Sequence, residues 1–119
     1  MLTVQIFGVK NSQSSRAAER FFKERRVTIH LVDLKQRPMA PGEIRRFIDR
    51  FGLAALLDTE GKSYTAAGMK YLKVTDADLL AKIERDPLLL RLPLVRSSTN
   101  KLSVGQDEAG WKAMLESET

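Results

Sequence analysis

The sequence contains no cysteine, which excludes disulfide bonds, thiolate metal sites and a cysteine nucleophile within the chain. It has one histidine, His30, and structural zinc usually takes four ligands of the His and Cys types, so we expect no metal site. No apolar run approaches the ~20 residues that a membrane-spanning helix needs. The opening MLTVQIFGVK lacks the pattern of a signal peptide. We therefore expect a cytoplasmic protein without membrane association.

The remaining composition is typical of one small soluble domain. The 119 residues are 43% hydrophobic and 29% charged, enough for one core but too few for two domains of normal size. We predict a single domain over residues 1–119. The net charge of +5 permits an acidic partner without requiring one.

The first third of the chain predicts a strand, a helix and a second strand. Residues 3–7 alternate and are rich in β-branched side chains, as are residues 28–32. Between them, residues 14–26 place two alanines and two phenylalanines on one helical face. A strand, helix and strand within ~30 residues form a βαβ unit with parallel strands.

The rest of the chain predicts a helical insert followed by a hairpin and a last helix. Helical periodicity begins near Pro41, recurs from about Tyr64 to Leu72, and recurs again after Thr75, whose spacing to Asp78 resembles a capping box. The predicted elements are an insert at about 41–86, strands at 94–96 and 102–104, and a helix from Asp107 that buries Trp111, Met114 and Leu115. The fold class is therefore α/β and thioredoxin-like: a mixed four-stranded sheet flanked by helices.

The turn between the first strand and the first helix is the best local candidate for a ligand site. Backbone N–H groups at a helix N-terminus favour anions, and Lys10 and Arg16 would add positive charge around Ser12, Ser14 and Ser15. The alternative is that one serine caps the helix and the others are solvated. The sequence leaves both open.

The basic residues of the two longer predicted helices permit a surface for nucleic acid or for an acidic protein. Interleaved acidic residues offer local pairing partners, and no aromatic stripe accompanies the charges, so a solvated helix face is the favoured alternative. His30 lies in an apolar strand without a readable partner, which argues against a Ser/His/Asp arrangement. Pro93 precedes the third strand either as a strand-initiating proline or as a cis-proline.

These elements and motifs resemble the arsenate reductase (ArsC)/Spx family, from Val4 to about Leu115. The segment IFGVKNSQSSRAAERFFKERRVTIHLVDLKQRP is similar to that family's strand, active-site turn, helix and second strand. RDPLLLRLPLV resembles its segment before the third strand, and NKLSVGQDE its final strand with the following glycine. No single motif is decisive, but their order and spacing together are specific.

The resemblance also shows where this chain departs from the family's enzymes. Those enzymes carry a reactive cysteine where this chain has Ser12, and some Spx-type members carry a second one where it has Ser15. The family's oxyanion-binding arginines fall near Asp58, at Leu92 with Arg91 beside it, and at Gln106. Pro93 matches the family's proline at the thioredoxin-type cis position. A serine hydroxyl forms no disulfide and has no redox cycle.

Two functions follow from the resemblance. The favoured one is a non-redox binding or regulatory module that needs no cofactor and binds a protein, by analogy with Spx-type members an RNA polymerase. The alternative is an arsenate reductase-like or glutathione-dependent oxidoreductase or transferase. In that case Lys10, Asn11, Ser12, Ser15, Arg16, Arg91 and Pro93 would bind glutathione or a small oxyanion. Nucleic-acid binding is the third and least favoured alternative.

Overall fold

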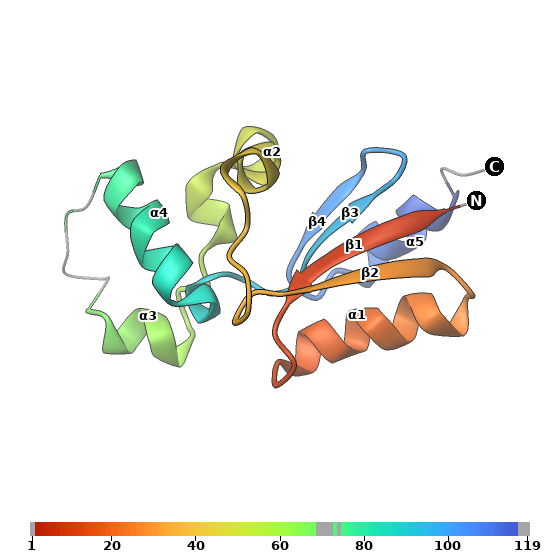
Figure 1. Ribbon diagram of the computed structural model, residues 1–119, viewed down its shortest axis with the longest axis horizontal. Coiled ribbons are helices and arrows are strands. Elements are labelled where there is room, and N and C mark those ends of the chain that lie inside the picture. The colour runs from red at the N-terminus through yellow and green to blue at the C-terminus, as the bar shows by residue number, and fades with distance from the viewer. Residues whose placement is uncertain (1, 69–72, 74, 117–119) are drawn as a thin grey trace. The chain divides into compact units, whose positions relative to one another are not determined.

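The computed structural model describes residues 2–68, 73 and 75–116, and their contacts form two compact units (Figure 1). The first unit contains Met1–Leu34 and Leu92–Thr119, and the second contains Lys35–Arg91. One domain with an insert at about 41–86 stays a prediction. The elements are β1 (Thr3–Gly8), α1 (Gln13–Glu24), β2 (Thr28–Asp33), α2 (Pro41–Phe51), η1 (Leu53–Leu56), α3 (Lys62–Ala66), α4 (Asp76–Arg85), η3 (Pro87–Leu89), β3 (Leu94–Ser97), β4 (Leu102–Val104) and α5 (Glu108–Glu116).

The first unit contains the predicted mixed four-stranded sheet, in the order β2-β1-β3-β4. β1 pairs in parallel with β2, placing Gln5 opposite His30, and antiparallel with β3, placing Ile6 opposite Val95. β3 and β4 form the predicted antiparallel hairpin. β1 is therefore hydrogen-bonded along both edges and forms the centre of the sheet.

The helices α1 and α5 contribute to one hydrophobic core against the sheet (Figure 1). Trp111 of α5 is fully buried, and its ring centroid lies 5.3 Å from that of Phe21 of α1. The indole Nε1 donates a hydrogen bond of 3.2 Å to the hydroxyl of Ser103 in β4, which satisfies both buried polar groups. The buried members of this core are Leu2, Val4, Ile6, Ala18, Phe21, Phe22, Val95, Trp111 and Met114.

The second unit is helical and has its own buried residues. In α2, Ile44 and Phe47 are buried, and Gly52 ends the helix with a φ of 84°. The predicted cap of α4 is confirmed, since the Thr75 hydroxyl accepts a hydrogen bond of 3.1 Å from the Asp78 N–H. Over the described residues, no helix is long and apolar enough to cross a membrane.

Two helix boundaries differ from the prediction. α1 ends at Glu24 rather than Arg26, because Arg26 adopts a φ of 59° and the Val27 N–H turns back to the Phe22 carbonyl. The short helix expected from about Tyr64 begins at Lys62 and ends at Ala66, before Gly68 takes a φ of 65°. The part of that expected helix at 69–72 lies outside the described residues.

The bond between Leu92 and Pro93 is cis, one of the two alternatives left open by the sequence. Pro93 is buried directly before β3, and its carbonyl accepts a hydrogen bond of 3.0 Å from the Gly105 N–H.

Gly8 provides a first test of this packing. A Cβ at Gly8 would overlap the Ser15 hydroxyl and lie 2.9 Å from the Ser15 Cβ, whereas a Cβ at Gly42 in α2 would meet nothing within 4 Å. We expect Gly8→Ala to lower the free energy of unfolding by about 1–3 kcal/mol. Gly42→Ala should leave it unchanged or raise it by up to ~1 kcal/mol. Urea unfolding of both variants measures this, and equal stabilities would contradict the packing described for Gly8.

Candidate functional site

The turn between β1 and α1 is closed by hydrogen bonds of its own backbone and serines. The Ser12 N–H donates to the Val9 carbonyl at 3.1 Å, and the Ser12 carbonyl accepts from the Arg16 N–H at 3.1 Å. Ser12 has an extended backbone, with φ −85° and ψ 122°, and its Oγ accepts from the Ser15 N–H at 3.2 Å. Ser12 is thus the N-cap of α1.

The Ser12 hydroxyl is also engaged as a donor. The Ser14 hydroxyl donates to the Leu92 carbonyl at 2.7 Å, and the Ser12 and Ser14 oxygens lie 3.1 Å apart. A serine has one hydroxyl proton, and that of Ser14 is already given to Leu92. Ser12 must therefore donate to Ser14 while it accepts from Ser15. This chain of hydroxyls links the turn to the residue before Pro93.

Ser15 differs from Ser12 and Ser14 because it is buried, with only 7% of its surface exposed. Its Oγ faces Gly8 and has no hydrogen-bond partner within the described part of the chain. The alternative prediction, in which one serine caps the helix and the others are solvated, is therefore confirmed for the cap, which is Ser12, and wrong for Ser15, which is buried. An unpaired buried hydroxyl carries a desolvation cost that is not recovered in the fold.

Some of the remaining predicted site residues lie at this turn, and others do not. Lys10, Asn11 and Arg16 are exposed on it. Pro93 follows Leu92, the acceptor of the Ser14 hydroxyl. Arg91 belongs to the second unit, where its side chain is exposed and its backbone N–H donates to the Leu56 carbonyl at 2.7 Å.

The three positions that the family resemblance matches to oxyanion-binding arginines carry no guanidinium group in this chain. Leu92 is buried and offers only its carbonyl to the turn, and Gln106 is exposed beyond β4. Asp58 lies in the second unit, where its N–H donates to the Leu89 carbonyl at 2.8 Å. Among the described residues, no group of three or more acidic or histidine side chains could hold a metal ion.

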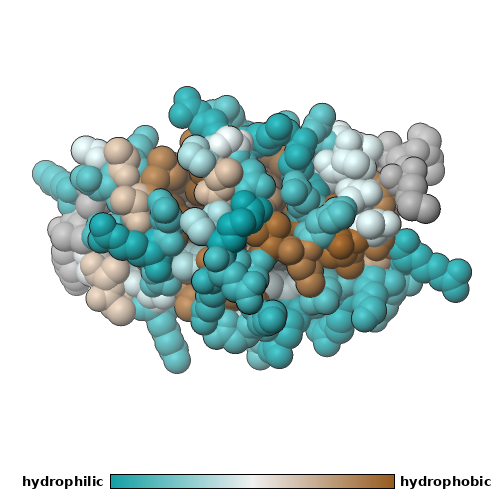
Figure 2. All heavy atoms as spheres, viewed as in Figure 1, coloured by the Kyte–Doolittle hydropathy of each residue, from teal (hydrophilic) through white to brown (hydrophobic). Residues whose placement is uncertain are grey.

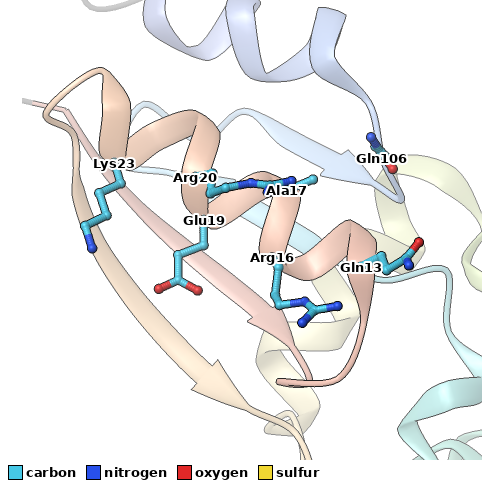
Figure 3. Close-up of a pocket in the computed structure, with 7 residues that line it drawn as sticks. All are labelled: Gln13, Arg16, Ala17, Glu19, Arg20, Lys23 and Gln106. Atoms are coloured by element: carbon cyan, nitrogen blue, oxygen red, sulfur yellow. The ribbon is translucent and has the colours of Figure 1, made fainter.

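A groove of about 620 Å³ along α1 was not predicted from the sequence (Figure 3). Gln106 forms the wall opposite α1, and Ala17 is the one small side chain among the described residues that line the groove. The spacing of Arg16 and Arg20 was visible in the sequence, but the approach of Gln106 depends on where the chain runs after β4. We call this the α1 groove; it is lined by Gln13, Arg16, Ala17, Glu19, Arg20, Lys23 and Gln106.

A second, smaller hollow of about 350 Å³ lies over the sheet and includes Gln5, His30 and Arg96. His30 is exposed and faces Gln5 across the β1–β2 pair. Arg96 donates from Nη2 to the Asn100 Oδ1 at 3.0 Å, while its buried Nε has no partner among the described residues. The structure places no serine of the β1–α1 turn in this hollow.

The sequence model described as the ArsC family matches residues 7–114. Solved structures with the same fold include the YffB (PA3664) protein, which is 17% identical, with a TM-score of 0.77 over 94% of this chain and 98% of that one. Arsenate reductase from Vibrio cholerae is 16% identical, with a TM-score of 0.76 over 97% of each chain. An ArsC-family-related protein from Bacteroides fragilis is also 16% identical, with a TM-score of 0.76 over 93% and 96%. No curated protein gave a significant match.

The hydrogen bonding of the turn predicts opposite effects on stability for the removal of the Ser12 and Ser15 hydroxyls. Ser12→Ala removes the cap of α1 and should lower the free energy of unfolding by about 1 kcal/mol. Ser15→Ala removes an unpaired buried hydroxyl and should raise it by up to ~1 kcal/mol. Urea unfolding of the two variants measures the difference. A destabilised Ser15→Ala protein would mean that the Ser15 hydroxyl has a partner.

Proposed function

We propose that the chain, which belongs to the ArsC family, is a binding or regulatory module without thiol redox chemistry. One observation carries this proposal. The side chain at the position of the family's reactive cysteine is Ser12, and its hydroxyl is used within the turn as donor to Ser14 and acceptor from Ser15.

The chemistry of a hydroxyl supports the same proposal. Arsenate reduction through this turn would require a thiolate that bonds to arsenic and then exchanges into a disulfide, and the chain has no thiol. Leu92 and Gln106 also lack the guanidinium groups that would hold a doubly charged oxyanion by charge-assisted hydrogen bonds. The residues of the turn therefore do not fit the cysteine-based reaction.

A protein is the partner that best fits such a module. By resemblance to Spx-type members, we propose an RNA polymerase as the first candidate. The net charge of +5 is compatible with an acidic surface on that partner. Location in the cytoplasm is part of this proposal.

The second candidate function is binding of glutathione or a small oxyanion at the turn, as a glutathione-dependent transferase would need. Unused backbone donors favour it. The N–H groups of Gln13 and Ser14 begin α1 and have no hydrogen-bond acceptor in the described part of the chain. Lys10 and Arg16 are exposed beside them. Helix N-terminal donors with nearby cations can bind an anion.

A titration separates the two candidates. Reduced glutathione, arsenate, sulfate and phosphate are added in turn while the backbone amide resonances of residues 11–16 are followed by NMR. The proposed function predicts flat titrations, because the Ser12 hydroxyl is already engaged at both its proton and its oxygen. Saturable shifts confined to these amides would support the second candidate instead.

A matched pair of variants controls for loss of stability in that titration. Ser12→Ala and Thr75→Ala each remove a hydroxyl N-cap, one from α1 and one from α4. A ligand held by the Gln13 and Ser14 N–H groups loses affinity in Ser12→Ala, because loss of the cap frays the first turn of α1, and keeps its affinity in Thr75→Ala. An equal loss in both variants would indicate an effect of stability alone.

Direct binding to purified bacterial RNA polymerase tests the proposed partner. We expect saturable binding of the immobilised chain that weakens as salt rises, because attraction between exposed charges is screened by salt. A heat-denatured sample of the chain is the control. The absence of saturable binding at low salt would rule out the polymerase as the partner.

A further inference from the structure

The α1 groove holds positive charge that the fold itself does not neutralise. Arg16, Arg20 and Lys23 are exposed, and none forms an ion pair with a described residue. Of the two acidic residues of α1, Glu24 lies 4.0 Å from Arg25, and Glu19 forms no ion pair with a described residue. Over α1, the outward surface is hydrophilic (Figure 2).

The two arginines are placed where they repel each other. Arg16 and Arg20 are four residues apart on α1, a spacing at which like charges destabilise a helix by ~0.2–0.5 kcal/mol. In Figure 3, Arg20 extends toward Gln106, whereas Glu19 and Lys23 extend away from it. The Glu19 carboxylate therefore does not lie between Arg20 and the far wall, and an anion from outside the chain can occupy that space.

We propose that the α1 groove binds an extended acidic segment of a partner protein, with carboxylates at alternate positions. Four helical residues rise about 6 Å, so Arg16 and Arg20 are about that far apart along the axis. Alternate side chains of an extended chain are about 6.6 Å apart and point to the same side. Each arginine can therefore take one carboxylate through paired N–H donors. A volume of about 620 Å³ is within the usual range of ligand pockets.

The other groups in the groove favour a peptide over RNA. Gln13 and Gln106 have both donors and acceptors in their amides, which match the C=O and N–H groups of a peptide backbone. No aromatic side chain among the described residues lines the groove, so unstacked bases find no surface there on which to stack.

The inference rests on the proposed function, because it names the chemistry of the partner that a binding module takes. The probe is a capped seven-residue peptide with glutamate at every second position and serine between. We expect saturable binding with amide shifts at residues 13, 16, 17, 20 and 106, and a dissociation constant that rises with salt.

The structure supplies a matched control for the arginines. Arg16→Gln/Arg20→Gln should weaken peptide binding at least tenfold. Arg46→Gln/Arg50→Gln removes the same charge at the same spacing from exposed positions of α2 and should change it less than twofold. Glu19→Gln removes the one negative charge of the groove and should strengthen binding severalfold. Amide spectra of all variants verify that they are folded.

Three results would overturn the inference: no saturable binding at low salt, an equal loss in both double variants, or tighter binding of a uridine oligonucleotide carrying the same number of charges. A peptide with lysine in place of glutamate should not bind. These outcomes can be told apart from those at the turn, because shifts at residues 17, 20 and 106 belong to the groove alone, whereas the glutathione and oxyanion titration follows residues 11–16. Flat titrations at the turn with no peptide binding would leave the proposed function standing and reject the groove.

Discussion

The packing of Trp111 against α1 is the interaction on which the first unit depends. The indole is fully buried beside Phe21 and Phe22, so it joins α5 to α1 across a core whose other side is the sheet. Its Nε1 donates to Ser103, which fixes α5 against β4 as well. Burial of large aromatic side chains dominates core energetics, and a satisfied polar group gives that burial one orientation. The turn and the groove are both held by α1 and therefore depend on this contact.

Local sequence patterns predicted most of the fold, because most of its strands and helices each show one clear pattern, such as alternation, helical spacing or a cap. Alternation located β1 and β2, helical spacing located Phe21 and Phe22, and the Thr75 cap located α4. The errors fall where backbone geometry overrides propensity. Arg26 takes a left-handed conformation that a non-glycine residue seldom adopts, and α1 stops two residues early. The start of α3 at Lys62 had no signal of comparable strength in the sequence.

The candidate site was predictable only where it is local. A serine-rich turn before a helix indicated that one of its serines could be the cap, and the structure shows that this serine is Ser12, three residues from its donor. The burial of Ser15 follows from its contact with Gly8 on the neighbouring strand, and the Ser14 bond to Leu92 spans 78 residues. Gln106 also lines the α1 groove, although it is even farther from α1 in the sequence than Leu92 is. Because the hydroxyls of Ser12 and Ser14 are engaged and that of Ser15 is buried, the exposed side chains of α1 that remain for binding are those of the α1 groove.

The order of the strands has a consequence for synthesis on the ribosome. β1 lies at the centre of the sheet, yet its partner β3 follows it by about ninety residues, and Thr3 pairs with Ser98 through two hydrogen bonds. Contacts between distant residues require closure of a long loop and slow folding. The N-terminal βαβ segment emerges early with one edge of β1 unpaired and with Phe21 and Phe22 of α1 lacking their contacts with Trp111. It completes its core only after Trp111 has left the exit tunnel, so this segment stays open to chaperones until then.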